Sequence, residues 1–140
     1  PITRRYRDGV DWHEAGGVAL MMELIARRGS CDGCRTLPEV EARYRGVDRL
    51  HAELSASRSM RTRAELLGLS FREKRGIYVH IGRDGQPIFG GGGCHRLGIA
   101  RLLDLDRIPV QVGAVHPLAI AHGAYGALRG GKGLARTQQP

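Results

Sequence analysis

Apolar residues recur at helical spacing in two stretches of the first half of the chain. Between Val18 and Arg28 they fall on one face of a helix, and Gly29 follows as a stop signal. Pro38 suits the first turn of a second helix, in which the apolar positions are three or four residues apart. These positions are Val40, Tyr44, Val47, Leu50 and Leu54. The pattern predicts two amphipathic helices, with Gly46 as a candidate break in the second.

The second half of the chain changes between strand and helix patterns. Apolar and polar residues alternate from Ile77 to Ile81, and the sequence Arg83-Asp84-Gly85-Gln86 is typical of a hairpin turn. Further apolar runs predict two more strands and two more helices. The expected strands cover Ile77–Ile81, Ile88–Phe89 and Ile108–Val112, and the expected helices cover Leu97–Leu103 and Pro117–Leu128. This order predicts a small α/β or α+β fold with a mixed sheet and packed helices.

The chain length of 140 residues suits one domain with a modest core. We expect an irregular arm over residues 1–17, anchored by Trp12, a domain over residues 18–128, and a disordered tail over residues 129–140. No apolar run is long enough to span a membrane, and no apolar signal region opens the chain. Three cysteines do not suggest a disulfide framework, so we expect a cytoplasmic location.

The charge balance favours an anionic partner. The net charge is +8, and 20 of the 22 basic residues are arginines. Arginine presents a planar fork of donors to oxyanions, so nucleic acid, nucleotide phosphates and acidic protein surfaces all fit. A genome rich in G and C would also encode arginine in place of lysine. Because only 5% of the residues are aromatic, a stacking platform for single-stranded nucleic acid is not expected.

The segment with the clearest chemistry reads Phe89-Gly-Gly-Gly-Gly-Cys94-His95-Arg96 and lies between an expected strand and an expected helix. A glycine-rich turn lets the backbone approach a phosphate, and the free amides at a helix start attract anions. His95 and Arg96 would add charged donors, and the same field would favour the thiolate of Cys94. The alternative is a flexible loop with a buried structural cysteine.

Residues 89–96 resemble the FGGCHR signature of the sulfiredoxins. This resemblance implies that Cys94 is a catalytic thiol and that the loop holds the phosphates of ATP. The phosphate-holding positions would be Gly91, Gly92, Gly93, Cys94, His95 and Arg96. Residues 43–112 also resemble the N-terminal domain of the ParB proteins, which belong to the same superfamily. The matching positions are Arg43, Val47–Leu54, Ile77–Ile81, Gly93–Arg96 and Ile108–Val110.

A wider resemblance, over roughly residues 9–117, is to a ParB-like family of archaea and bacteria. It rests mainly on Ile81-Gly82-Arg83-Asp84-Gly85, His95-Arg96-Leu97, Ile108-Pro109-Val110 and His116. That family usually carries Asp-Gly-Arg-His-Arg where this chain has Gly-Gly-Cys-His-Arg, so Cys94 is closer to the sulfiredoxins. The resemblance implies a ParB/sulfiredoxin-like domain with a glycine-rich phosphate loop between strand and helix.

Other candidate site residues lie outside the loop. Arg58, Ser59 and Thr62 resemble in kind the residues that hold nucleotide in sulfiredoxin-like folds, although a solvated basic loop fits them equally well. His116 follows the last strand and either faces the glycine loop or is a helix-capping or surface histidine. Glu73 is the candidate base by analogy with a related kinase that phosphorylates free serine.

These features predict a nucleotide-dependent phosphotransferase, either kinase-like or sulfiredoxin-like. The nucleotide would be ATP, ADP or CTP with Mg²⁺, and the acceptor a small molecule or a protein. The alternative is a DNA-binding or nucleotide-gated ParB-like module without catalysis, although ParB's helix-turn-helix is absent. Cys31 and Cys34 have CxxC spacing, which fits a metal, redox or structural pair. No second ligand pair completes a metal site, so no metal ligands are predicted.

Overall fold

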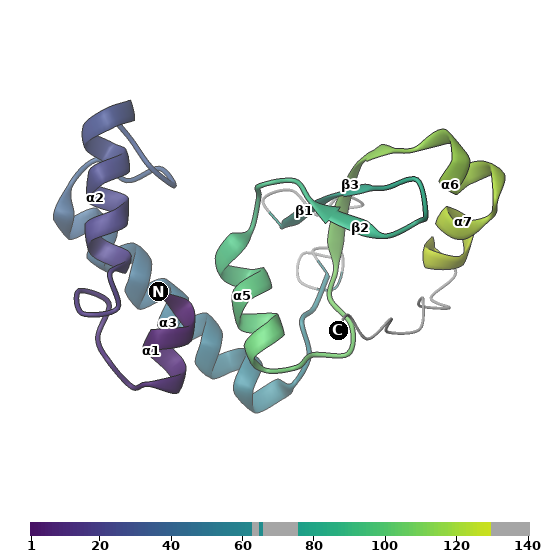
Figure 1. Ribbon diagram of the computed structural model, residues 1–140. Coiled ribbons are helices and arrows are strands. Elements are labelled where there is room, and N and C mark those ends of the chain that lie inside the picture. Colours follow the sequence, from purple (N-terminus) through teal and green to yellow (C-terminus); the bar gives the residue numbers. More distant parts are fainter. Residues whose placement is uncertain (63–64, 66–75, 130–140) are drawn as a thin grey trace. The chain divides into compact units, whose positions relative to one another are not determined.

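The computed structural model describes residues 1–62, 65 and 76–129 (Figure 1). The chain divides into two units, of which the first contains residues 1–60 and 95–108 and the second contains residues 61–94 and 109–140. Within the described residues, helices and a small three-stranded mixed sheet form an α+β fold, which confirms the predicted fold class. None of the helices in these residues has the length and apolar character needed to cross a membrane.

The long helix α3 (Leu37–Ser57) carries much of the core of the first unit. A capping box between Thr36 and Glu39 starts it, with a proline in its first turn as expected. Its buried residues are Val40, Tyr44, Val47 and Leu54. The helix continues through Gly46, so the expected break there is absent.

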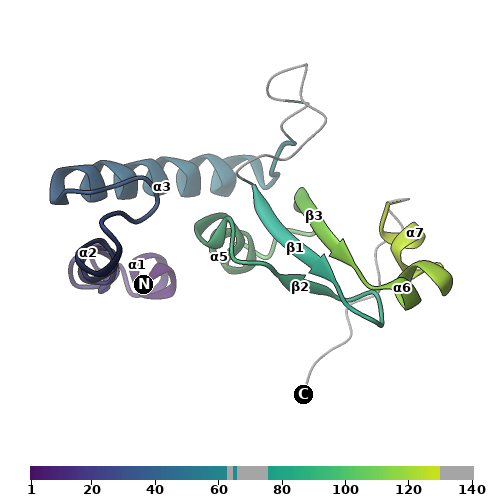
Figure 2. The same ribbon diagram turned by 90° about the horizontal axis from the view of Figure 1, so that it is seen from above.

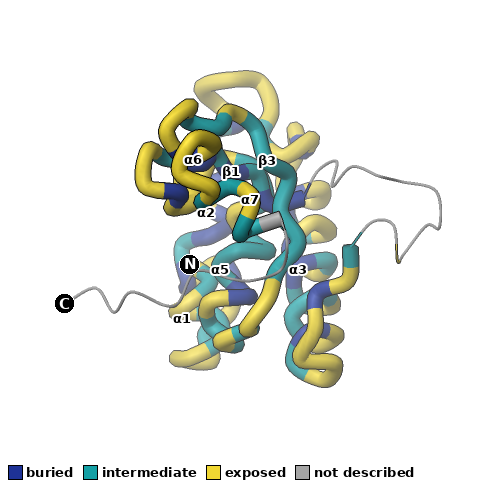
Figure 3. Tube along the Cα trace, turned by 90° about the vertical axis from the view of Figure 1, so that its right-hand side faces the viewer, coloured by how far each residue is buried: buried dark blue, intermediate teal, exposed yellow. Residues whose placement is uncertain are grey.

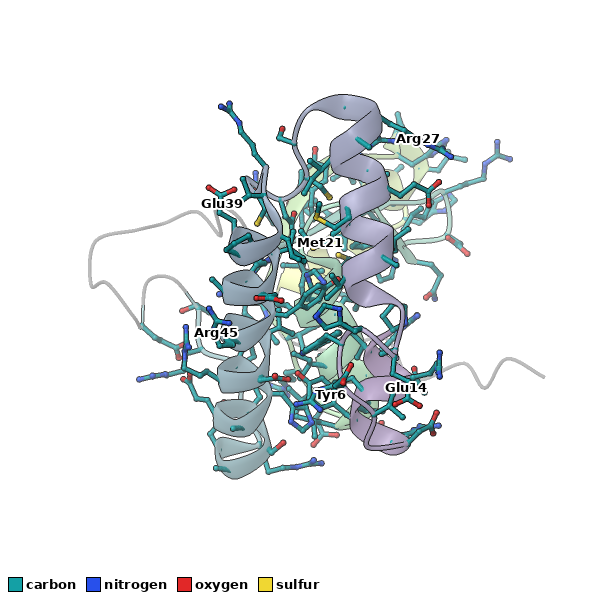
Figure 4. The ribbon with its side chains drawn as sticks, turned by 90° about the vertical axis from the view of Figure 1, so that its left-hand side faces the viewer. Tyr6, Glu14, Met21, Arg27, Glu39 and Arg45 are labelled. Carbon is teal, nitrogen blue, oxygen red and sulfur yellow. The ribbon has the colours of Figure 1, made fainter. Side chains whose placement is uncertain are left out.

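Helix α2 (Gly17–Arg28) packs beside α3. It ends as predicted at Gly29, whose φ of 76° is readily adopted by glycine and whose N–H binds the carbonyl of Ile25. Met21 points into the space between α2 and α3, whereas Arg27 points away from it (Figure 4). One apolar face of each helix therefore builds the core of the first unit, as the spacing predicts.

The N-terminal segment is more ordered than the expected irregular arm. Residues Ile2–Arg7 form helix α1, and the predicted anchor Trp12 is only 7% exposed. The carboxylate of Asp48 on α3 accepts hydrogen bonds from the side chains of Arg5, Tyr6 and Trp12. A single acidic group on α3 holds the N-terminal segment in place.

The second unit contains the sheet, in the order β2-β1-β3 (Figure 2). The central strand β1 (Ile77–Ile81) pairs antiparallel with β2 (Pro87–Phe89) and parallel with β3 (Val110–Val115). The hairpin predicted between β1 and β2 is present and is closed by a bond from the Gly82 amide to the Gln86 carbonyl. The third strand starts two residues later than the predicted Ile108.

The two faces of β1 differ in burial. Ile77, Val79 and Ile81 are buried, and the intervening Tyr78 and His80 are half-buried. Gly113 on β3 lies against both rings, since a Cβ there would overlap the Tyr78 hydroxyl and stand 3.1 Å from Cε1 of His80. The glycine therefore makes room for two aromatic side chains on this face of the sheet.

The helix predicted over Pro117–Leu128 is two short helices. α6 (Pro117–Ala121) and α7 (Ala124–Arg129) are separated by Gly123, which has a φ of 73°. A left-handed residue cannot continue a right-handed helix, so the chain turns there. Much of α6 is exposed, including Leu118 and Ile120 (Figure 3). The tail expected over residues 129–140 lies outside the described residues after residue 129.

Candidate functional site

The glycine loop at residues 90–93 is fastened to strand β1 in the second unit. The amide of Gly90 donates to the carbonyl of Tyr78 over 2.8 Å, and the amide of Tyr78 donates to the carbonyl of Gly92 over 3.1 Å. Helix α5 (Cys94–Leu102) starts directly after the loop. The predicted junction from strand through glycine loop to helix is therefore present, and its backbone is held by hydrogen bonds.

Close packing against β1 explains most of these glycines. A Cβ at Gly93 would stand 2.6 Å from the carbonyl oxygen of Gly76, and one at Gly90 would stand 2.5 Å from Cδ1 of Tyr78. A Cβ at Gly92 would stand 3.1 Å from the Cβ of Tyr78. At Gly91, whose φ is 96°, such a Cβ would have no atom of the described residues within 4 Å. The glycine content is thus required by the fold itself, and Gly91 is the position at which the loop backbone is open to its surroundings.

The first turn of α5 carries two of the predicted site residues in accessible positions. Cys94 is exposed and is not part of a disulfide. Arg96 is half-buried, and its guanidinium has no hydrogen bond or ion pair with another residue in the described part of the chain. A guanidinium without a protein partner, in the first turn of a helix, is available to an external anion.

His95 belongs to the first unit and is largely enclosed there. Its side chain is 16% exposed, and its ring meets Tyr44 edge-on at a centroid distance of 5.7 Å. Nδ1 lies 3.6 Å from the carboxylate of Asp32, which also accepts a hydrogen bond from Arg43. Burial and the charge of Arg43 lower the pKa of His95 more than Asp32 raises it. The surroundings of His95 therefore favour the neutral imidazole.

Sequence reasoning missed the residues that surround His95. Asp32 lies in the turn between Cys31 and Cys34, and Tyr44 was expected only as a core residue of α3. The Asp-Gly pair is a turn signal that identifies the local conformation of residues 31–34. It does not reveal that the turn presents a carboxylate to a histidine 63 positions later in the chain.

The candidates in the basic loop make local bonds. Arg58 ends α3 in the left-handed region, with a φ of 53°. The backbone of Ser59 bonds to the hydroxyl of Ser57, and the hydroxyl of Thr62 donates to Glu65 over 2.9 Å. Arg58 and Ser59 belong to the first unit and Thr62 to the second. Their observed partners are those of turns and helix ends.

The last two candidate residues are His116 and Glu73. His116 is the N-cap of α6, because its Nδ1 accepts a hydrogen bond from the amide of Leu118 over 3.2 Å. The structure thus shows the helix-capping role, which was one of the alternatives for this histidine. The candidate base Glu73 lies outside the described residues.

Within residues 1–62, 65 and 76–129, no group of three or more His, Cys, Asp or Glu side chains could hold a metal ion. Comparison with family models, with curated proteins and with solved structures finds no match to this chain. The ParB/sulfiredoxin-like assignment therefore stays a prediction that rests on the motifs.

Proposed function

We propose that this chain binds the phosphates of a nucleotide over Gly91–Arg96 and transfers a phosphoryl group. The observation that carries the proposal is the guanidinium of Arg96, which has no partner among the described residues and lies in the first turn of α5. A helix start bears about half a positive charge from its unpaired amides. An arginine at the same place adds a full charge and a fork that can bind two phosphate oxygens.

The surrounding loop favours binding because its backbone is already fixed. The hydrogen bonds between Tyr78 and the glycine loop hold the segment before α5, so little entropy is lost when a phosphate is bound. Gly91 is the member of the loop that faces open space and can approach a phosphate closely. His95 is enclosed, and its lowered pKa favours the neutral form. Arg96 therefore supplies the positive charge that binds phosphate, and His95 orients the first turn of α5.

Phosphoryl transfer would follow one of two routes. In the sulfiredoxin-like route the exposed Cys94 is the nucleophile, and in the kinase-like route Glu73 is the base that activates an acceptor hydroxyl. Mg²⁺ is commonly held by the phosphate oxygens of its nucleotide and by water, so it would enter this site together with the nucleotide. The wider resemblance to a family that usually lacks this cysteine favours the kinase-like route.

DNA binding is the second candidate function, and it rests on the net charge of +8. Three of the arginines in the first unit, Arg5, Arg27 and Arg43, form ion pairs with acidic side chains. These guanidinium groups already have partners and are less available to the phosphates of DNA. We therefore place DNA binding behind nucleotide binding.

The proposal is tested by measuring the melting temperature with ATP, ADP and CTP, each with and without Mg²⁺. A bound nucleotide stabilises the folded chain by an amount that grows with the logarithm of its affinity at a fixed concentration. Arg96→Ala should weaken the affinity about tenfold or more, because a hydrogen bond to a charged group contributes about 1.5–3 kcal/mol. Arg101→Ala is the matched control, since Arg101 is exposed in the last turn of the same helix. Equal affinities for both variants would contradict the proposal.

A further inference from the structure

The segment from Cys31 to Cys34 forms a tight antiparallel turn in the first unit. The amide of Cys31 donates to the carbonyl of Cys34 over 2.9 Å, and the amide of Cys34 donates to the carbonyl of Cys31 over 2.8 Å. Asp32 and Gly33 between them have φ angles of 51° and 82°, as in a type I′ turn. The two cysteines are therefore directly opposite each other.

This pairing brings the cysteine backbones to the separation of a disulfide. Residues that exchange both backbone hydrogen bonds have Cα atoms about 5.5 Å apart. Disulfide-bonded cysteines have Cα atoms roughly 4.4–6.8 Å apart, so the Cα separation expected for this pair already suits the bond. The thiols of Cys31 and Cys34 are both free in the structure.

The backbone pairing of Cys31 and Cys34 also makes a disulfide between them easy to reduce. Opposite Cβ atoms in a ladder are about 4.5–5.5 Å apart, whereas a disulfide holds them about 3.8 Å apart. Closing the bond must therefore draw the two Cβ atoms together by about 1 Å within a turn that its hydrogen bonds already fix. Strained disulfides are more easily reduced than structural ones.

The surroundings give the two thiols different roles. Cys31 is half-buried, whereas Cys34 is 6% exposed and its Sγ lies 3.5 Å from the carbonyl oxygen of Glu39. Burial, followed by the charge of Glu39, raises the pKa of Cys34. The more accessible Cys31 is thus the thiol that meets an external oxidant first, and Cys34 is the thiol that reacts next.

We propose that Cys31 and Cys34 form a dithiol site that is reversibly oxidised by low-molecular-weight disulfides such as oxidised glutathione. The Cys31 thiolate attacks one sulfur of the oxidant, so a mixed disulfide forms and one small thiolate leaves. The Cys34 thiolate then attacks the sulfur of Cys31, and a second small thiolate leaves. The two protons lost by the cysteines end on the two small thiols, and the cysteine pair is oxidised by two electrons.

Oxidation at this site acts on the turn that carries Asp32. The Asp32 carboxylate bonds to Arg43 and lies near His95, so closing the disulfide changes a turn that contacts the histidine of α5. The redox chemistry itself does not depend on nucleotide binding. It therefore stands or fails separately from the proposed function.

The test equilibrates the full chain, in a Cys94→Ser background, with graded ratios of oxidised and reduced glutathione. Samples are quenched in acid, alkylated and weighed by mass spectrometry. We expect a disulfide form that takes up no alkylating agent at Cys31 and Cys34 and is lighter than the unalkylated dithiol by two hydrogen atoms. This form should be converted back to the dithiol as reduced glutathione is added. A chain that stays fully alkylated at every ratio, or a disulfide that resists excess reduced glutathione, would overturn the proposal.

Single variants test the order of the steps in the same background. Cys34→Ser removes the second thiol, so the mixed disulfide with glutathione should accumulate on Cys31. Cys31→Ser leaves only the buried thiol, and glutathione should be added at least about tenfold more slowly. Equal rates of glutathione addition to the two variants would contradict the assigned order.

Discussion

The indole Nε1 of Trp12 donates a hydrogen bond of 3.1 Å to the carboxylate of Asp48, which lies 36 positions later on α3. The same carboxylate accepts from the Tyr6 hydroxyl over 2.9 Å and from the guanidinium of Arg5. One acidic side chain thus accepts hydrogen bonds from three side chains of the N-terminal segment. Without it, an indole N–H and a phenol that are both partly buried would lose this partner.

Asp48→Ala should lower the free energy of unfolding of the first unit by about 1.5–3 kcal/mol, the usual contribution of hydrogen bonds to a charged group. Asp48→Asn should cost less, because its amide oxygen still accepts from Trp12 or Tyr6. Urea unfolding followed by the fluorescence of Trp12, the only tryptophan, measures the change. Asp106→Ala, at an exposed position of the same unit, is the control. Equal losses in Asp48→Ala and Asp106→Ala would refute the anchoring role.

Stability should also fall as the pH drops below about 6.5, because two partly buried histidines bind protons more weakly in the folded chain. Burial is the main cause of the lowered pKa of both His95 and His51. A lowered histidine pKa means that the unfolded chain binds more protons as the pH falls through its own pKa of 6.5. The stabilisation is therefore complete above pH 6.5. It is lost progressively as the pH falls from 6.5 to the lower pKa of the histidine in the folded chain.

His95→Gln should flatten this dependence, as measured by urea unfolding at a series of pH values between about 8 and 5. His51→Gln should remove a separate part of the pH dependence of stability. His13→Gln serves as the control, because His13 is 60% exposed in the same unit. A pH profile that His95→Gln leaves unchanged would show that the enclosed imidazole is not responsible.

Two helical glycines of the first unit should respond to alanine in opposite directions. Gly46 lies inside α3 with only the end of the Arg49 side chain near its missing Cβ, so Gly46→Ala should stabilise the unit by about 0.5–1 kcal/mol. A Cβ at Gly17 would stand 2.9 Å from the hydroxyl of Tyr44 and 3.0 Å from the Trp12 ring. Gly17→Ala should therefore destabilise it by about 1–3 kcal/mol. The same sign for both substitutions would contradict the packing around Gly17.

Sequence patterns predicted the features that depend on neighbouring residues. The helical period located α2 and α3, and the alternation of apolar and polar residues located β1. The break at Gly123 was missed because the small residues around it fit one continuous helix. The bonds of Asp48 join segments far apart in the chain, and no local pattern encodes them.

The candidate site shows the same division between local and distant information. The loop before α5 was predicted from its glycines, and the helix begins at Cys94. The glycines were interpreted through phosphate binding, whereas the structure shows that Gly90 and Gly93 are needed for contact with β1. A glycine indicates that another group comes close to its backbone, but the sequence does not say which group that is. Only the position of β1 identifies the partner.

Binding to DNA should be weak and should depend steeply on salt. Electrostatic binding weakens as counterions compete for the phosphates, so we expect binding to be lost by about 150 mM salt. Fluorescence anisotropy with labelled double-stranded DNA over a range of salt concentrations measures this, with heparin as a competing polyanion. The arginines are spread along the whole chain and no recognition helix was predicted. Binding that persists above that salt concentration and prefers one sequence would instead favour the DNA-binding function.

The two proposed routes of phosphoryl transfer differ in what they require of Cys94. A sulfiredoxin-like reaction uses the thiolate as the nucleophile that attacks the phosphorylated sulfinate, so Cys94→Ser should abolish turnover. A kinase-like reaction needs positioning, charge neutralisation and a base, so Cys94→Ser should keep most of the activity. In that case Glu73→Gln should lower the rate by about a hundredfold or more, the usual contribution of a general base.

The deciding measurement is release or transfer of the terminal phosphate of ATP with Mg²⁺, with a sulfinic acid peptide and with a free hydroxy amino acid as alternative acceptors. Cys31→Ser is the matched control, because Cys31 is a free cysteine of the first unit, whereas Cys94 belongs to the second unit. We expect Cys94→Ser and Cys31→Ser to behave alike and Glu73→Gln to be inactive, since the wider resemblance is to a family that usually lacks a cysteine at position 94. Loss of turnover with the sulfinic acid peptide in Cys94→Ser alone would reverse this order and assign the covalent route.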